Sequence, residues 1–198
     1  EVINPTTERI VGSVPIGDEG DINAAISAAR SAFDSWSKSS IEERQGYLNA
    51  ISSAIAERGE EIAEVITSEV GTPINYSRMA MVGTPRVVAR SYAKILDEFE
   101  WEEEVRNSII VKEPIGVAGM ITPWNFPSAM ITRKAGPALA AGCTIVCKPS
   151  EDTPLSALAL AELGIRAGIP DGVFNVVTGD RSDAATIGNA LSTHPSIR

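Results

Sequence analysis

The chain has 198 residues, a formal net charge of −9 and 43% hydrophobic residues. This length fits one domain or slightly more and is sufficient to bury a core. No apolar run approaches the roughly 18 residues that a membrane helix requires, and the start of the chain lacks the pattern of a signal peptide. We therefore expect a cytoplasmic protein with no membrane partner. Nucleic acid is a poor partner for so acidic a chain, and one histidine without a CxxC pair leaves almost no ligands for a structural zinc site.

The acidic charge lies in the first half of the chain. Residues 1–104 hold 19 acidic against 9 basic residues, a net charge of −10, whereas residues 105–198 hold 7 against 8, a net charge of +1. The change follows the run Glu98–Glu104, which reads EFEWEEE. This run is either an acidic interaction arm or, as we favour, a solvated face.

Most of the first half has the periodicity of helices. Residues 2–11 predict two short strands around a polar turn. Apolar residues at three- and four-residue spacing then predict helices from Asp18 to Trp36, from Glu42 to Arg58 and from Glu60 to Val70. A fourth helix is predicted over Ile74–Phe99, where Pro85 should interrupt or kink it. The β-branched centre of Val105–Lys112 predicts a strand.

From residue 115 onward, strands and helices alternate. The predicted strands are Val117–Ile121, Thr144–Cys147 and Val173–Val177, and helices are predicted over residues 128–141, 154–168 and 182–191. Short connections between them imply parallel strands joined by right-handed crossovers. The fold class is therefore α/β, with half of the parallel sheet of a doubly wound nucleotide-binding fold.

Ligands of such sheets bind beyond the carboxyl ends of the strands, which directs attention to residues 121–127, 148–152 and 178–183. None of these loops carries a GxGxxG or GxxxxGK[ST] motif. Lys148 leaves a strand end directly, and Glu151 follows three positions later. A lysine and a carboxylate there could hold a ribose, the carboxylate repelling a 2′-phosphate. They could equally form a surface ion pair at a turn.

Residues 122–127 read TPWNFP, so two prolines enclose an indole, an amide and a phenyl ring. The segment is either an aromatic plug under a turn or a stiff loop that presents Asn125. An asparagine between two aromatic residues is expected to be partly buried and to satisfy its amide. An amide N–H directed at a reacting carbonyl would stabilise an oxyanion. Cys143 and Cys147, in contrast, have no nearby histidine or cation cluster and are predicted to be core residues.

Four segments in order resemble motifs of the aldehyde dehydrogenase superfamily. Gly119–Pro127 (GMITPWNFP) is similar to its G-x-I-x-P-W-N-[FY]-P signature, and the blocks at residues 136–144 (GPALAAGCT), 148–154 (KPSEDTP) and 168–179 (GIPDGVFNVVTG) resemble the motifs that follow. Residues 3–7 (INPTT) match its amino-terminal N-P-[AT]-T. Residues 130–137 (MITRKAGP) lean weakly towards the succinate-semialdehyde branch.

The resemblance implies oxidation of an aldehyde to a carboxylic acid with NAD, or NADP, through a cysteine thiohemiacetal and a thioester. Carried over by motif, Asn125 is the catalytic residue present and donates its amide to the thiohemiacetal oxygen. The implied cofactor-binding residues are Ile121, Thr122, Pro123, Trp124, Lys148, Ser150, Glu151, Gly179 and Gly188. Among these, Glu151 favours NAD over NADP, and no residue is assigned to a metal.

The family's nucleophilic cysteine and catalytic glutamate come later than Arg198, so the chain is expected to be a piece of a protein more than twice as long, inactive by itself. Its expected organisation is an amino-terminal hairpin and helical layer (1–104), a strand of a β oligomerisation arm (105–114) and the first half of the NAD-binding sheet (115–198). A homodimer or homotetramer is implied. The alternatives are an acyl-phosphate or acyl-CoA reductase of the same superfamily, and a non-catalytic nucleotide-binding or interaction module.

Overall fold

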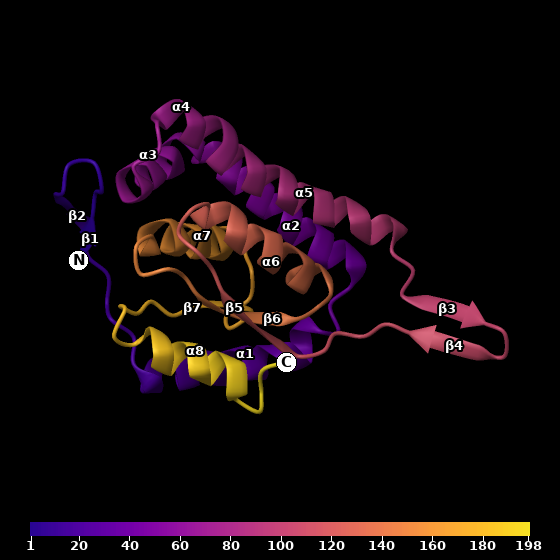
Figure 1. Ribbon diagram of the computed structural model, residues 1–198. Helices are drawn as coiled ribbons and strands as arrows, with labels where there is room; N and C mark the ends of the chain where they lie inside the picture. Colours follow the sequence, from indigo (N-terminus) through magenta and orange to yellow (C-terminus); the bar gives the residue numbers. More distant parts are fainter.

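The computed structural model describes all 198 residues. At its centre lies a parallel sheet in the order β5-β6-β7, formed by Val117–Ile121, Thr144–Lys148 and Phe174–Val176. Helix α6 (Pro127–Ala140) joins β5 to β6, helix α7 (Pro154–Arg166) joins β6 to β7, and both lie on one side of the sheet (Figure 1). Every residue of β6 is buried, as expected for a middle strand with both faces covered. The predicted α/β class is confirmed.

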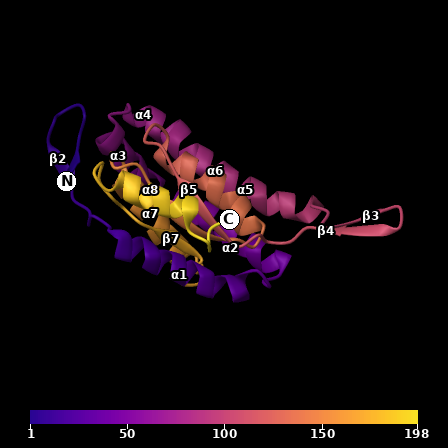
Figure 2. The ribbon, with the colours of Figure 1, turned by 60° about the horizontal axis from the view of Figure 1, so that its bottom comes forward.

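The opposite face of the sheet is covered by α1 (Glu19–Trp36) and α8 (Ala184–Thr193), which come forward in Figure 2. After α8 the chain returns to the free edge of β5, where Ile197 forms a parallel bridge with Val117 and the Arg198 N–H donates to the Val117 carbonyl at 3.0 Å. The chain thus extends the sheet first on one side of β5 and then on the other. This reversal places a topological switch point beside β5, which is where ligands of such sheets bind.

A second helical layer covers α6 and α7. It consists of α2 (Ile41–Glu57), α3 (Gly59–Val70) and α5 (Gly83–Glu98), and its apolar faces close the larger core cluster (Figure 1). The layer is tied to the sheet domain by Glu69, which is buried near the end of α3. Its carboxylate accepts hydrogen bonds from the backbone N–H of Leu155 at 2.5 Å and of Ser156 at 2.9 Å, and from the Ser156 hydroxyl. Glu69 therefore caps the first turn of α7, where backbone N–H groups have no partners within the helix.

The predicted interruption near Pro85 is present, but it lies before the proline. The short helix α4 (Ile74–Tyr76) continues into a π-helical turn, η1 (Ser77–Val82), and Pro85 falls in the first turn of α5. A proline leaves the carbonyl four residues earlier without its helical donor, and that residue, Met81, lies in the π turn. The wider turn thus accommodates the proline without ending the helical path.

Two hairpins extend from opposite ends of the molecule (Figure 1). The first, β1 (Val2–Ile3) with β2 (Ile10–Gly12), was expected. The second joins β3 (Glu102–Val105) to β4 (Ser108–Val111). The strand predicted over Val105–Lys112 is therefore confirmed only in part, as β4, because Val105 belongs to the partner strand β3, which was not predicted. The chain turns back at Arg106, whose φ is +61°. Glutamates are uncommon in strands, which is why the run before residue 105 did not read as one. Its glutamates Glu102–Glu104 are all exposed, in agreement with a solvated face.

Candidate functional site

The loops after β5, β6 and β7 meet at one edge of the sheet, because parallel strands end on the same side. The Thr122 N–H donates to the Lys148 carbonyl at 3.1 Å, and the Val177 N–H donates to the Cys147 carbonyl at 2.9 Å. These bonds continue the ladder past the strand ends and hold the three loops in register. Parallel pairing therefore brings the three segments selected from the sequence, residues 121–127, 148–152 and 178–183, together at the carboxyl ends of the strands.

Lys148 and Glu151 form an ion pair with Nζ and Oε2 3.3 Å apart. The Lys148 side chain is only 5% exposed, so the pair is not the surface contact that was one of the two interpretations. The pKa of the Glu151 carboxyl is lowered, first by a hydrogen bond from its own backbone N–H and further by the positive charge of Lys148. Ser150 is buried, and its hydroxyl accepts from the Asp152 N–H at 3.3 Å, which shapes the turn. The result is an ionised carboxylate held at the end of the middle strand.

A third charged residue, Arg181, joins this pair from the loop after β7. Its Nε lies 3.4 Å from Oε1 of Glu151, opposite the oxygen that faces Lys148. Sequence reasoning selected the loop at residues 178–183 but missed this arginine. The sequence did contain a signal for it, because Arg181 is a cation in the loop that follows β7, the strand next to β6.

The loop before α6 presents Asn125. Helix α6 begins at Pro127, and the Phe126 ring packs edge-on against Tyr76 of α4, with centroids 6.3 Å apart. Asn125 itself is exposed, and its side-chain amide makes no hydrogen bond within the chain. The expectation that this amide is partly buried and satisfied is therefore wrong. The packed Phe126 and the buried Pro127 anchor the carboxyl side of the loop, and the Asn125 amide remains available to a ligand.

Apolar and small residues lie beside the switch point. Ile121 is exposed at the end of β5. A Cβ added to Gly188 of α8 would meet only Cδ1 of Ile121, at 3.8 Å. Gly179 differs, because a Cβ there would lie 2.6 Å from the Ile187 side chain. Its missing side chain therefore lets α8 pack closely against the loop. Thr122 is buried, whereas Pro123 and Trp124 are exposed.

These residues fit an adenine dinucleotide. The carboxylate of Glu151 can accept hydrogen bonds from ribose hydroxyls, Lys148 supplies a cation, and Ile121 offers an apolar surface to a base. No group of three or more His, Cys, Asp or Glu side chains is arranged to hold a metal ion. No helix combines the length and apolar character needed to cross a membrane.

Both cysteines are buried and unpaired. Burial raises the pKa of the Cys147 thiol to about 12. Because the thiolate is the reactive form of cysteine, Cys147 is unsuited to nucleophilic attack, as its place in a predicted strand indicated.

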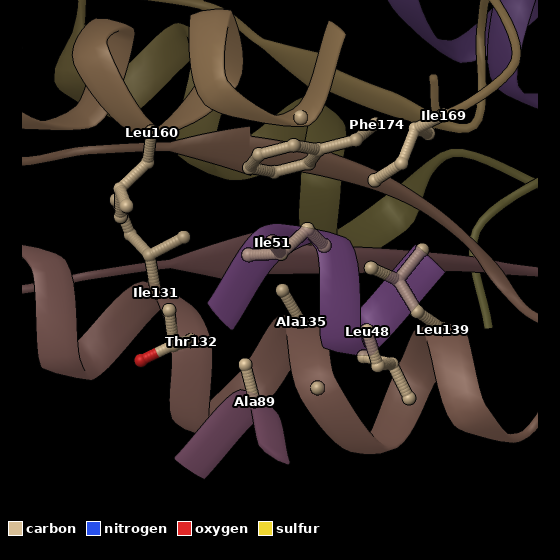
Figure 3. A pocket seen from close by; sticks show the side chains of 12 residues that line it. Leu48, Ile51, Ala89, Ile131, Thr132, Ala135, Leu139, Leu160, Ile169 and Phe174 are labelled. Carbon is tan, nitrogen blue, oxygen red and sulfur yellow. The ribbon is translucent and has the colours of Figure 1, made fainter. Parts of the chain in front are cut away.

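A small apolar cavity between α2, α5, α6 and α7 lies away from this edge (Figure 3). Its volume is about 30 Å³, and side chains such as Leu48, Ile131 and Phe174 line it. A space of this size holds about one water molecule. It is a packing defect of the core and is too small for a substrate.

The chain belongs to the aldehyde dehydrogenase family, whose family model matches residues 1–198. A provisionally assigned aldehyde dehydrogenase of Staphylococcus aureus is 42% identical over 200 residues, which cover 100% of this chain and 41% of that protein. The chain therefore spans about two fifths of the length of this curated relative.

Solved structures agree with the fold. A mutant aldehyde dehydrogenase C of Pseudomonas syringae, in complex with NAD+ and octanal, is 42% identical with a TM-score of 0.95, covering 99% of this chain and 40% of that chain. An NADP-dependent enzyme of Escherichia coli is 42% identical with a TM-score of 0.93, covering 100% of this chain and 41% of that chain. Family membership and the parallel-sheet fold inferred from the sequence are thus confirmed.

Proposed function

We propose that the protein carrying this chain oxidises an aldehyde to a carboxylic acid, with NAD or NADP as hydride acceptor. One observation carries the proposal: the loop with Asn125 and the Lys148–Glu151 pair leave neighbouring strands at one edge, joined by the bond from Thr122 to Lys148. A hydrogen-bond donor for a reacting oxygen and a carboxylate that can hold a ribose thus follow neighbouring, hydrogen-bonded strands of one sheet. Family membership gives this arrangement its chemical interpretation.

Asn125 is proposed to stabilise the oxygen of the reacting aldehyde. When a thiolate attacks the carbonyl carbon, the carbonyl oxygen gains negative charge, and an amide N–H can donate to it without losing a proton. Helix α6 begins two residues later, so its positive end adjoins the same loop. Two features of the loop thus favour an anion at this position.

Lys148 and Glu151 are proposed to hold the adenosine ribose, with Ser150 supporting their turn. The cofactor pocket is proposed to be lined by the backbone of Ile121, Thr122, Pro123 and Trp124, and Gly188 is proposed to leave room for the adenine. Gly179 contributes by allowing the close packing of α8 against its loop. NAD or NADP, when bound, accepts the hydride that leaves the substrate carbon. Because an ionised carboxylate repels a 2′-phosphate, Glu151 alone favours NAD.

The nucleophilic cysteine and the glutamate that activates water are proposed to lie outside these 198 residues, so the chain alone is inactive. Cys143 and Cys147 are excluded as nucleophiles by their burial. The substrate is proposed to be an aldehyde, and the resemblance of residues 130–137 leans weakly towards the succinate-semialdehyde branch. We further propose a cytoplasmic homodimer or homotetramer; the free cysteines fit a reducing compartment.

The test is Asn125→Ala in the intact protein, with Asn23→Ala as a matched control on the exposed face of α1. Loss of one oxyanion donor lowers kcat by about 100- to 1000-fold. The rate of NADH or NADPH formation should fall by this factor for Asn125→Ala and remain unchanged for the control. Single-turnover measurements must first show that hydride transfer limits the rate. An unchanged rate for Asn125→Ala under that condition contradicts the role of this residue.

A further inference from the structure

The position of Arg181 opposite Lys148 changes what the Glu151 carboxylate can bind. One carboxylate oxygen is 3.3 Å from the Lys148 ammonium, and the other is 3.4 Å from Nε of Arg181. Two cations and one anion leave a formal charge of +1 where the lysine and glutamate alone would leave none. The outer cation is also the one accessible to a ligand, because the Arg181 side chain is 83% exposed whereas that of Lys148 is 5% exposed.

The backbone around Arg181 is fixed by its own turn. Oδ1 of Asp180 accepts hydrogen bonds from the Ser182 N–H at 2.7 Å, from the Ser182 hydroxyl at 2.6 Å and from the Asp183 N–H at 3.2 Å. Asp180 is thereby occupied and forms no ion pair with Arg181. Arg181 is left with a single side-chain hydrogen bond, a long one to Glu151, and the other N–H groups of its guanidinium are free to bind.

A weak, exposed ion pair is easily exchanged for a stronger one. Exposed pairs contribute little to stability, so turning the guanidinium from Glu151 towards a nearby anion costs little. A phosphate monoester carries a charge of about −1.5 to −2 at neutral pH, and arginine binds phosphate with two parallel hydrogen bonds. The 2′-phosphate of NADP is attached to the ribose that Glu151 is proposed to hold.

We propose that Arg181 is a coenzyme-specificity residue that allows this site to bind NADP as well as NAD. With NAD, Glu151 accepts from the ribose hydroxyls, and Arg181 shields its charge. With NADP, Arg181 turns to the 2′-phosphate and offsets the repulsion by Glu151. The inference rests on the proposed function, since it requires the adenosine ribose to lie at Lys148 and Glu151.

The adenosine halves of the two coenzymes test this without a catalytic readout. Adenosine 2′,5′-bisphosphate carries the 2′-phosphate, and adenosine 5′-monophosphate lacks it. Their dissociation constants are measured by titration calorimetry with the intact protein, for wild type, Arg181→Ala and Arg181→Lys. Arg166→Ala is the matched control, because it removes an exposed arginine from a pair with Glu162 at the far end of α7.

For wild type we expect the two dissociation constants to differ by less than tenfold. Arg181→Ala should weaken binding of the bisphosphate by about 10- to 100-fold, because it removes two charge-assisted hydrogen bonds of which each contributes about tenfold, and it should leave binding of the monophosphate within twofold. Arg181→Lys keeps the charge but loses the bidentate geometry, so its dissociation constant for the bisphosphate should lie between those of wild type and Arg181→Ala. Arg166→Ala should change neither dissociation constant.

Two results overturn the inference in distinguishable ways. If wild type binds the monophosphate but Arg181→Ala changes the two affinities equally or not at all, Arg181 has no role in specificity, while the nucleotide site stands. If wild type binds neither compound and no NAD or NADP, the proposed nucleotide site is itself wrong.

Discussion

Cys147 lies in the middle strand of the sheet, where no part of its side chain reaches solvent. Removal of the thiolate from water raises its pKa to about 12 from an ordinary value of 9.0. Between these two pH values the native state binds a proton that the unfolded state has released. Stability therefore falls as pH rises from about 9 to about 12.

We predict that neither cysteine reacts with iodoacetamide in the native protein at pH 8. The Cys147 thiolate is scarce, and Cys143, only 5% exposed, is screened by its neighbours. Peptide mass spectrometry should find both unmodified in native protein and both alkylated after denaturation in guanidinium chloride. Native alkylation of Cys147 would contradict the burial argument. The nucleophilic cysteine proposed to lie outside these 198 residues serves as an internal control in the intact protein.

The residues of the site differ in how far sequence could reveal them. Lys148 and Glu151 are three positions apart, so local spacing predicted a pair, and the structure adds that the lysine is buried. Asn125 was selected for its chemistry, yet its exposure was not foreseen, because burial depends on elements far along the chain. Arg181 meets Glu151 across 30 positions, and only the parallel pairing of β6 and β7 makes them neighbours.

The space around a helical glycine shows how closely its helix packs against neighbouring residues. In α7, a Cβ added at Gly164 would meet Ile169 at 3.5 Å and Phe174 at 3.7 Å, both ordinary contacts, and it would lie beside the small cavity. In α6, a Cβ added at Gly136 would lie 2.6 Å from the Tyr92 ring. The two glycines border the same cavity, but only Gly136 is required by a close approach.

We therefore predict opposite effects of alanine at these two positions. Gly164→Ala should raise the free energy of unfolding by about 1 kcal/mol through helix propensity, with a further gain from filling the cavity. Gly136→Ala should lower it by about 1–3 kcal/mol because the Tyr92 ring must move. Gly46→Ala is the control for propensity alone, since no atom lies within 4 Å of its added Cβ. Calorimetric unfolding of the intact protein checks the order, and a stabilising Gly136→Ala would refute it.

At the level of elements, hydrophobic periodicity predicted the three parallel strands and the helices between them. It did so because each helix must cover one face of the sheet with an apolar stripe. It failed where local preference and tertiary structure disagree. Glutamates at residues 102–104 read as a solvated run, yet pairing with Ile109–Val111 makes them a strand. The π turn before Pro85 was anticipated only as a kink, because the sequence marks where a helical bond is lost and not how the backbone adjusts.

The whole molecule is a layered body from which the β3–β4 hairpin projects (Figure 1). All residues of both strands are exposed, and β4 carries three apolar side chains, Ile109, Ile110 and Val111. An isolated hairpin with apolar residues and free edges is marginally stable in water and invites pairing with another chain. This exposure fits the proposed homo-oligomer, in which the hairpin meets a second copy.

We predict that replacing Ile109 and Ile110 together by lysine reduces the oligomer of the intact protein to smaller species. These residues pair with Glu104 and Glu103 on β3, so the introduced lysines face opposite charges and should preserve the hairpin itself. The exposed apolar surface of β4, in contrast, is reduced to Val111. The matched control is Ile165→Lys on α7, where a single isoleucine is 71% exposed and scattered apolar side chains need no partner. Analytical ultracentrifugation should show a lower mass for the hairpin variant and an unchanged mass for the control. If the hairpin variant keeps the wild-type mass at micromolar concentration, association does not depend on Ile109 and Ile110 of this hairpin.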